Sequence, residues 1–171
     1  MAYDFDKQYQ VGEEGEQVLD KFFRTRFYIK NASSTDQHNG TDRFFVSTST
    51  GKRYSVEYKT DALAASTGNV FIETVSVDTS ETRGWAYTSC AQVLIYYIPP
   101  EALAYMVPMM DIKRLIHDWE DRFTTKCVPN NGYNTMGIAV PRTVFEADCH
   151  LAEERELWID SGDVLIVKGQ L

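Results

Sequence analysis

The sequence lacks three features that would each indicate a particular class of protein. No stretch approaches the roughly 18 uninterrupted apolar residues of a membrane span. Met1 to Gln10 carries charges of both signs instead of an apolar signal-peptide core. We therefore expect a soluble, cytoplasmic protein that neither enters a membrane nor leaves the cell by a classical signal. No CxxC pair is present, and we expect reduced, mostly buried thiols at Cys90, Cys127 and Cys149.

A net positive charge is also lacking. The chain has a formal charge of −8 and a pI of about 4.9. This argues against a nucleic-acid partner, because phosphate binding is driven by Lys and Arg displacing counterions. The acids are unevenly spread, however: residues 1–60 hold nine acids and nine bases, whereas residues 61–171 hold sixteen acids and eight bases. If nucleic acid is bound, we expect the N-terminal third to face it.

The composition is that of a folded domain. A chain of 171 residues with 43% apolar and 13% aromatic content is long enough and apolar enough to bury a real core. No internal repeat, linker or low-complexity segment divides it. We therefore expect a single domain over residues 1–171.

Hydrophobic patterning predicts elements along the whole chain. Residues 12–27 place apolar side chains at the three-and-four spacing of one helix face, as do residues 110–123. The polar stretch 31–41 predicts a loop. Expected strands cover residues 43–48, 53–59, 69–77, 92–98, 102–107 and about 164–167, with 92–98 central. Less regular segments are a short helix or irregular connection at 82–91, an apolar run at 137–140 and a helix at about 142–151.

The predicted hairpin at residues 43–59 brings three charged side chains together. Alternate residues of a strand share a face, so Glu57 and Lys59 project together. A reversal near residue 50 places Asp42 across from Glu57 or Tyr58. Two carboxylates this close repel unless a cation compensates them, and Mg²⁺ prefers such oxygen ligands. The group predicts a metal site in which Lys59 positions water or neutralises charge on a phosphodiester.

The spacing of these residues resembles a nuclease pattern. Gly40-Thr41-Asp42, followed fifteen residues later by Glu57-Tyr58-Lys59, is similar to the motif of the PD-(D/E)xK nuclease superfamily. That superfamily includes restriction endonucleases and Holliday-junction resolvases. Thr41 stands where the motif's name has proline, a variation that the superfamily tolerates. The resemblance covers about residues 12–98, and a C-terminal elaboration at about 99–171 lies outside it.

The resemblance implies a fold and an activity. The fold would be α/β, with a restriction-endonuclease-like α-β-β-β-α-β core, a mixed central sheet, and C-terminal helical and strand additions. The activity would be hydrolysis of DNA by a Mg²⁺-dependent endonuclease, with Mn²⁺ able to substitute and RNA an open alternative. Asp42, Glu57 and Lys59 would be catalytic, with Asp42 and Glu57 binding the metal. The small size resembles a junction resolvase or phage-type endonuclease of DNA recombination or repair, which would work in a host cytoplasm if phage-encoded.

Two further acids are candidate metal ligands. Glu16 looks like the glutamate that the superfamily commonly places on the helix before the hairpin, although an acid there would equally favour the helix dipole. Glu73 lies in an apolar strand, where an unpaired buried charge is costly. It would either line the site beside Glu57 or point outward. For the hairpin group as a whole, the alternative is a solvated cross-strand charge cluster.

Basic residues near the predicted cleft are candidate nucleic-acid contacts. Phosphate binding needs bases near the site and not a basic protein overall, although each base is individually typical of an ordinary surface. The candidates are Arg24, Arg26, Lys30, His38, Lys52, Arg53 and Arg83. Trp85 and Tyr87 would stack on a base or cap the core, and the core role is favoured.

Two other functions fit the same residues. A catalytically inactive module of the same fold would bind a protein partner through the acidic C-terminal part. A nuclease subunit would act only within a larger assembly. If the chain cuts two strands by itself, a homodimer would suit that task.

Overall fold

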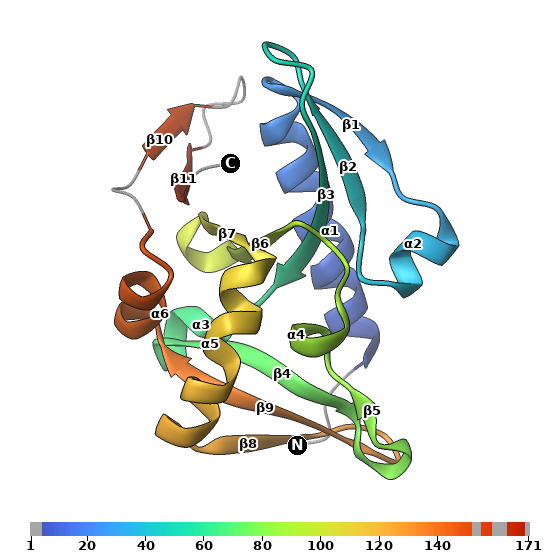
Figure 1. Ribbon diagram of the computed structural model, residues 1–171, viewed down its shortest axis with the longest axis vertical. Coiled ribbons are helices and arrows are strands. Elements are labelled where there is room, and N and C mark those ends of the chain that lie inside the picture. Colours follow the sequence, from blue (N-terminus) through green and yellow to red (C-terminus); the bar gives the residue numbers. More distant parts are fainter. Residues whose placement is uncertain (1–4, 152–154, 159–163, 170–171) are drawn as a thin grey trace.

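The computed structural model describes residues 5–151, 155–158 and 164–169, which form an α/β structure with two sheets (Figure 1). The larger sheet is mixed, with strand order β1-β2-β3-β6-β7-β11-β10, and the smaller is antiparallel, with order β5-β4-β9-β8. The larger sheet contains β1 (Phe27–Asn31), β2 (Arg43–Ser47), β3 (Arg53–Thr60), β6 (Val93–Ile98), β7 (Leu103–Pro108), β10 (Arg155–Trp158) and β11 (Val164–Lys168). The smaller contains β4 (Asn69–Val77), β5 (Thr82–Arg83), β8 (Thr125–Pro129) and β9 (Asn134–Pro141).

Helices flank both sheets. They are α1 (Phe5–Phe23), α2 (Ser34–His38), α3 (Ala64–Thr67), α4 (Trp85–Thr88), α5 (Met109–Arg122) and α6 (Arg142–Asp148), with 3₁₀ turns at Asp78–Ser80 and Pro99–Glu101. Within the described part of the chain, none of these helices combines the length and the apolar character needed to cross a bilayer.

The larger sheet separates two hydrophobic cores. Every residue of β6 is buried, and alternate residues face opposite sides. Leu94, Tyr96 and Ile98 join a core with α5 and the smaller sheet. Val93, Ile95 and Tyr97 join a second core with α1. The apolar run therefore predicted a central strand correctly, because only a strand covered on both faces needs apolar residues throughout.

Helix α1 ends earlier than its pattern predicted. Leu19, Phe22 and Phe23 are buried as expected, but the helix ends at Phe23 and Phe27 begins strand β1. The Phe27 ring lies 5.0 Å from that of Phe45, within the same core. Phe27 follows Phe23 by four residues, which is a helical spacing, but it reaches the α1 core from strand β1. The predicted helix is therefore confirmed over residues 12–23, but its extension to Phe27 was wrong, and β1 was not predicted.

The segment at residues 31–41 is not wholly a loop, because it contains helix α2. Ser33 caps this helix in a capping box: Asp36 N donates to Ser33 Oγ, and Ser33 N donates to the Asp36 side chain. The Ser and Asp residues that suggested turns therefore begin a short helix instead. The hairpin that follows was predicted correctly, as β2 and β3.

Strand β4 has the predicted bounds but a different place. It pairs with β5 and β9 in the smaller sheet, whereas β3 pairs in parallel with β6. The prediction of a strand at residues 69–77 is confirmed, but β4 does not continue the sheet of the hairpin. Its main partner, β9, lies some sixty residues further along the chain, and that pairing carries no local sequence signal.

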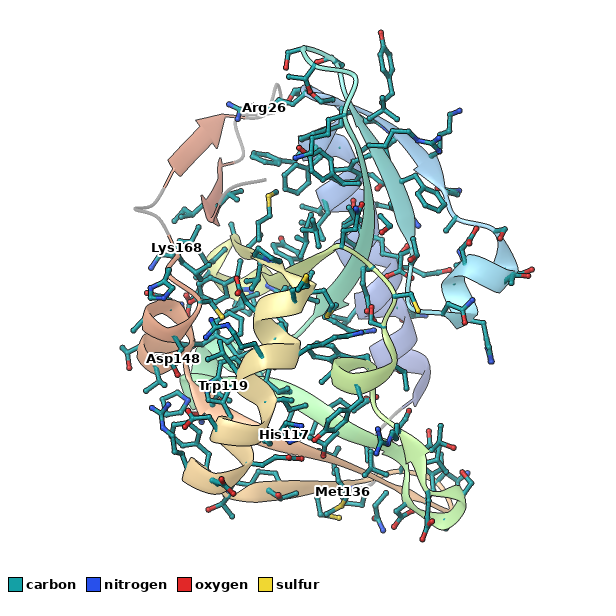
Figure 2. All side chains as sticks on the ribbon, in the orientation of Figure 1. Arg26, His117, Trp119, Met136, Asp148 and Lys168 are labelled. Carbon is teal, nitrogen blue, oxygen red and sulfur yellow. The ribbon has the colours of Figure 1, made fainter. Side chains whose placement is uncertain are left out.

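The C-terminal half follows its apolar pattern. Helix α5 buries the predicted stripe of Ile112, Leu115, Ile116 and Trp119. Trp119 Nε1 donates a 2.8 Å hydrogen bond to Asp148 Oδ2, which joins α5 to α6 (Figure 2). Strands β8 and β10 were not predicted. The three cysteines are free, but only Cys149 is buried; the expectation of mostly buried thiols was wrong, because Cys90 and Cys127 are exposed.

Candidate functional site

Asp42 directly precedes strand β2, at the end of the β2–β3 hairpin opposite its turn. Arg43 pairs with Val56, so the register places Asp42 opposite Glu57, as the sequence predicted. Asp42 N donates to Val56 O at 2.8 Å, and Asp42 Oδ2 accepts from Tyr58 N at 2.7 Å. The Asp42 backbone and one of its carboxylate oxygens are therefore fixed by strand β3.

Glu57 is a buried carboxylate with unequal oxygens. Its residue surface is only 2% exposed. Oε1 lies 2.7 Å from Lys59 Nζ, which fulfils the prediction that these side chains project together. Oε2 is buried and accepts no hydrogen bond from the residues that the structure describes. A buried carboxylate oxygen without a hydrogen-bond donor carries a desolvation cost.

The surroundings of Glu57 and Lys59 shift both of their pKa values upward. Burial raises the pKa of the Glu57 carboxyl, against the lowering effects of Lys59 and the nearby Ser89 hydroxyl. For Lys59, burial alone would lower the pKa, but the charge and hydrogen bond of Glu57 outweigh it and raise the pKa. Lys59 therefore stays protonated at neutral pH.

Lys59 joins the hairpin to the smaller sheet. Its side chain remains 34% exposed, and Nζ lies 5.9 Å from the centre of the Trp85 ring. Glu73, on β4, is close enough to contribute to the raised pKa of Lys59. The Glu73 carboxylate itself accepts a 3.3 Å hydrogen bond from Trp85 N. Glu73 thus lies near Lys59, and its carboxylate is hydrogen-bonded to the first residue of helix α4.

Glu16 is held by an arginine. Arg43 Nη2 donates to Glu16 Oε2 at 2.7 Å, and Arg43 Nε donates to both oxygens of Asp20 at 3.1 Å. Burial raises the pKa of Glu16, with smaller contributions from Asp42 and Asp20, while Arg43 lowers it. Glu16 is therefore within electrostatic reach of Asp42, but its Oε2 oxygen is bound to Arg43.

Arg43 and Tyr58 tie helix α1 to the site. Arg43 Nη1 donates to the backbone oxygen of Asp42 at 3.0 Å, and the Tyr58 hydroxyl donates to Asp20 Oδ1 at 3.0 Å. The Arg43 guanidinium lies 5.5 Å from the centre of the Tyr58 ring. Because Tyr58 N also holds the Asp42 carboxylate, this buried network positions Asp42 through both its backbone and its side chain.

Ser89 fixes the segment that leads into Asp42. It is fully buried, and its hydroxyl donates to the Gly40 carbonyl oxygen at 3.1 Å. Gly40 has φ +76°, and a Cβ there would meet Ser89 atoms at 2.8–3.0 Å. Glycine is thus required both for the backbone conformation and for the close approach. The same hydroxyl lies near the Glu57 carboxyl and acts to lower its pKa, against the effect of burial.

The structure brings Asp42, Glu57 and Lys59 together and places Glu16 and Glu73 at their periphery. Over the described residues, no three His, Cys, Asp or Glu side chains are grouped so as to hold a metal ion. Asp42 and Glu57 are the two carboxylates that the hairpin register places opposite each other. Two carboxylates with waters and substrate oxygens are a usual environment for Mg²⁺.

The seven candidate nucleic-acid contacts are all exposed but lie in different places. Arg24 and Arg26 come directly after helix α1, and Lys30 lies in strand β1. Lys52 and Arg53 lie where the hairpin turn meets strand β3. His38 ends helix α2. Arg83, on β5 of the smaller sheet, lies over the Tyr87 ring at 5.1 Å. Trp85 is buried in the core, as favoured, and Tyr87 is half-buried.

Sequence reasoning missed Asp20, Arg43, Tyr58 and Ser89. Asp20 interrupts the apolar end of α1 beside the buried Leu19, and Arg43 begins a β-prone run, so a charge pair inside the core was a detectable signal. The Ser89–Gly40 contact joins segments 49 residues apart and left no local pattern. Comparison of the chain with protein-family models, curated proteins and solved structures finds no match.

Proposed function

We propose that this protein is a metal-dependent nuclease that hydrolyses phosphodiester bonds in DNA. The proposal is carried by the buried Glu57 carboxylate, which lies in register with Asp42, pairs through Oε1 with Lys59 and leaves Oε2 without a donor. A divalent cation is the natural partner for such an oxygen. The residues therefore fit Mg²⁺, with Mn²⁺ as a substitute, held by Asp42 and Glu57.

Each residue of the group has a distinct role. When bound, Mg²⁺ supplies Lewis acidity toward the phosphodiester and lowers the pKa of a coordinated water. Asp42 is held in place by Tyr58 N, and Glu57 orients Lys59 through Oε1. Because Lys59 stays protonated, it donates a hydrogen bond to water or a phosphate oxygen and stabilises developing negative charge. It does not remove the proton from the attacking water.

The order of elements supports assignment to a restriction-endonuclease-like fold. Helix α1 precedes the antiparallel strands β1, β2 and β3, and α4 then leads to β6, which is parallel to β3. This succession is α-β-β-β-α-β, interrupted by the short helix α2 after β1 and by helix α3 and the smaller sheet's strands β4 and β5 before α4. The likeness is in topology, which by itself assigns function only weakly, so the proposal depends on the site.

Cleavage assays with matched variants test the proposal. Supercoiled plasmid, single-stranded DNA and a four-way junction are incubated with wild-type protein, with and without Mg²⁺ or Mn²⁺. We expect cleavage only with metal, and a loss of at least about 100-fold in rate for Asp42→Ala and Lys59→Ala, since each removes charge stabilisation. Lys126→Ala, at an exposed position on β8, is the control and should cleave like wild type.

A binding measurement separates this proposal from its main alternative. An inactive module of the same fold is the second candidate, because no three His, Cys, Asp or Glu side chains are grouped to hold a metal ion among the described residues. Calorimetric titration with Mn²⁺ should give binding that Asp42→Ala abolishes. If no substrate is cut and Mn²⁺ binding is absent or unaffected by Asp42→Ala, the nuclease proposal is wrong.

A further inference from the structure

Strands β1, β2 and β3 present one sheet face that leads away from Asp42 and Glu57. Residues that are paired across antiparallel strands have their side chains on the same face of the sheet. The register therefore defines two rows of side chains across β1, β2 and β3, beyond Asp42 and Glu57. The first row contains Lys30, Phe44 and Ser55, and the second contains Tyr28, Val46 and Arg53. We call these six residues the open face.

Helix α1 covers the opposite face of the same strands. The alternate residues Ile29, Phe45 and Tyr54 pack in or against the α1 core. On the open face, Tyr28 is 69% exposed, and Lys30 and Arg53 are exposed. Phe44 and Val46 are half-buried and belong to neither core. In Figure 1, α1 lies behind these strands, and no described helix crosses in front of β1 and β2.

The charge of the open face is opposite to that of the whole protein. It carries two bases, Lys30 and Arg53, and the acids on the same side of the hairpin are the site residues Asp42 and Glu57. The net charge of the chain is −8. Two exposed bases on one face of such an acidic protein make that face suited to a polyanion.

The aromatic side chains indicate which polyanion fits. Phe44 shares a row with Lys30, and Tyr28 shares a row with Arg53. The nucleobases of a single strand stack on aromatic rings, while Lys and Arg contact the phosphates. In a duplex the base faces are already stacked on one another, so an exposed ring on a flat sheet has nothing to stack on. Rows two residues apart are about 7 Å apart. Arg53 is two rows from Glu57, so the open face accommodates a few nucleotides.

We propose that the open face binds single-stranded nucleic acid and leads the strand to Asp42 and Glu57. The proposal rests on the proposed nuclease function and specifies its substrate class, a single strand or the unpaired part of a branched molecule. Lys30 and Arg53 hold the phosphates, and Tyr28 stacks on a base.

Equilibrium binding without metal tests this proposal separately from catalysis. Fluorescence anisotropy of a labelled oligo(dT) strand and of a hairpin duplex is measured in EDTA over a range of salt concentrations. We expect wild type to bind the single strand more tightly than the duplex. Tyr28→Ala should weaken single-strand binding at least about fivefold while leaving the salt dependence unchanged. Lys30→Gln and Arg53→Gln should each reduce the slope of log K against log salt by about 0.7.

Two control variants show whether the effects belong to the open face. Tyr28→Phe keeps the ring and should bind like wild type, which a merely structural role for the hydroxyl would not predict. Lys126→Gln changes an exposed lysine on another edge strand, β8, and should leave the slope unchanged. Equal binding of duplex and single strand, with no effect of Tyr28→Ala, overturns the proposal. If metal-dependent cleavage is still observed in that case, only the binding proposal is wrong and the nuclease proposal is retained. If single-strand binding is observed without any cleavage, only the nuclease proposal is wrong.

Discussion

At the scale of single residues, Glu57 and Lys59 contribute unequally to stability. Glu57 is almost completely buried, and Lys59 is one third exposed. Loss of Lys59 leaves a buried charge without compensation, whereas loss of the Glu57 charge leaves an ammonium group that water still reaches. The ion pair is thus arranged to keep a charged carboxylate inside the protein, which a metal-binding site requires.

Lys59→Met should destabilise the protein in a pH-dependent way. Burial raises the pKa of Glu57 above its ordinary value of 4.5, so stability falls as pH rises from 4.5 through the folded-state pKa. Without Lys59 the folded-state pKa is higher still and the fall is larger. We expect a loss of about 2 kcal/mol in the free energy of unfolding at pH 7, and little loss near pH 4. Urea unfolding followed by circular dichroism at both pH values measures it.

The Glu57→Gln/Lys59→Met double variant is the control for that experiment. It carries no titrating group at position 57, so the difference in stability between neutral and acidic pH that is due to this pair should disappear. If Lys59→Met lowers the free energy of unfolding equally at both pH values, the Glu57 carboxylate is not the source of the effect.

Three of the site residues could be predicted because two local rules place them. Strand parity puts Glu57 and Lys59 on one face, and hairpin register puts Asp42 opposite Glu57. The network of Asp20 and Arg43 that positions Asp42 depends on the docking of α1 against the sheet. That docking is tertiary, and no pattern within either segment specifies it.

At the scale of elements, helix α1 approaches strand β3 through a glycine. A Cβ at Gly15 would overlap the side chain of Thr60, at the C-terminal end of β3. Gly12, one turn earlier on the same helix, has nothing within 4 Å of its Cβ position. The two glycines therefore have different roles, close packing for Gly15 and no steric requirement for Gly12.

Alanine substitution should have opposite effects at these two positions. Gly12→Ala should raise the free energy of unfolding by up to about 1 kcal/mol, because alanine favours the helix and meets no neighbour. Gly15→Ala should lower it by about 1–3 kcal/mol, because the overlap with Thr60 outweighs the same propensity gain. Thr60→Ala in the Gly15→Ala background should recover part of the loss. Chemical denaturation of the four proteins checks this, and stabilisation by Gly15→Ala would contradict the packing of α1 on β3.

Most elements could be predicted from sequence, but their sheet membership could not. Strand β4 was predicted with its correct bounds, but its sheet could not be predicted, because its partner β9 follows it by some sixty residues. Strand β1 was missed because Phe27 satisfies a helical spacing as well as a strand facing the same core. Periodicity identifies which face is buried, and two different elements can bury the same residue.

At the scale of the whole molecule, the two cores share the strands of one sheet. Residues of β6 and β7 alternate between the core with α1 and the core with α5. Loss of either core would expose one face of both strands to water, at a cost of about 1.5–3 kcal/mol for each large apolar side chain. The cores should therefore unfold together, as the prediction of a single domain requires.

Thiol labelling tests this cooperativity, because the three free cysteines differ in burial. Cys90 and Cys127 are exposed and should react with iodoacetamide in the native protein. Cys149 is buried in the α5 core, and burial raises the pKa of its thiol to about 12, so it should react only after opening. In increasing urea, the free energy of Cys149 opening should match that of global unfolding by circular dichroism. Mass spectrometry assigns the labelled cysteine, and Cys90→Ser/Cys127→Ser removes the background. The free energy of Cys149 opening could instead be much lower than the free energy of global unfolding measured by circular dichroism. In that case the α5 core unfolds by itself, and the chain contains two cooperative units.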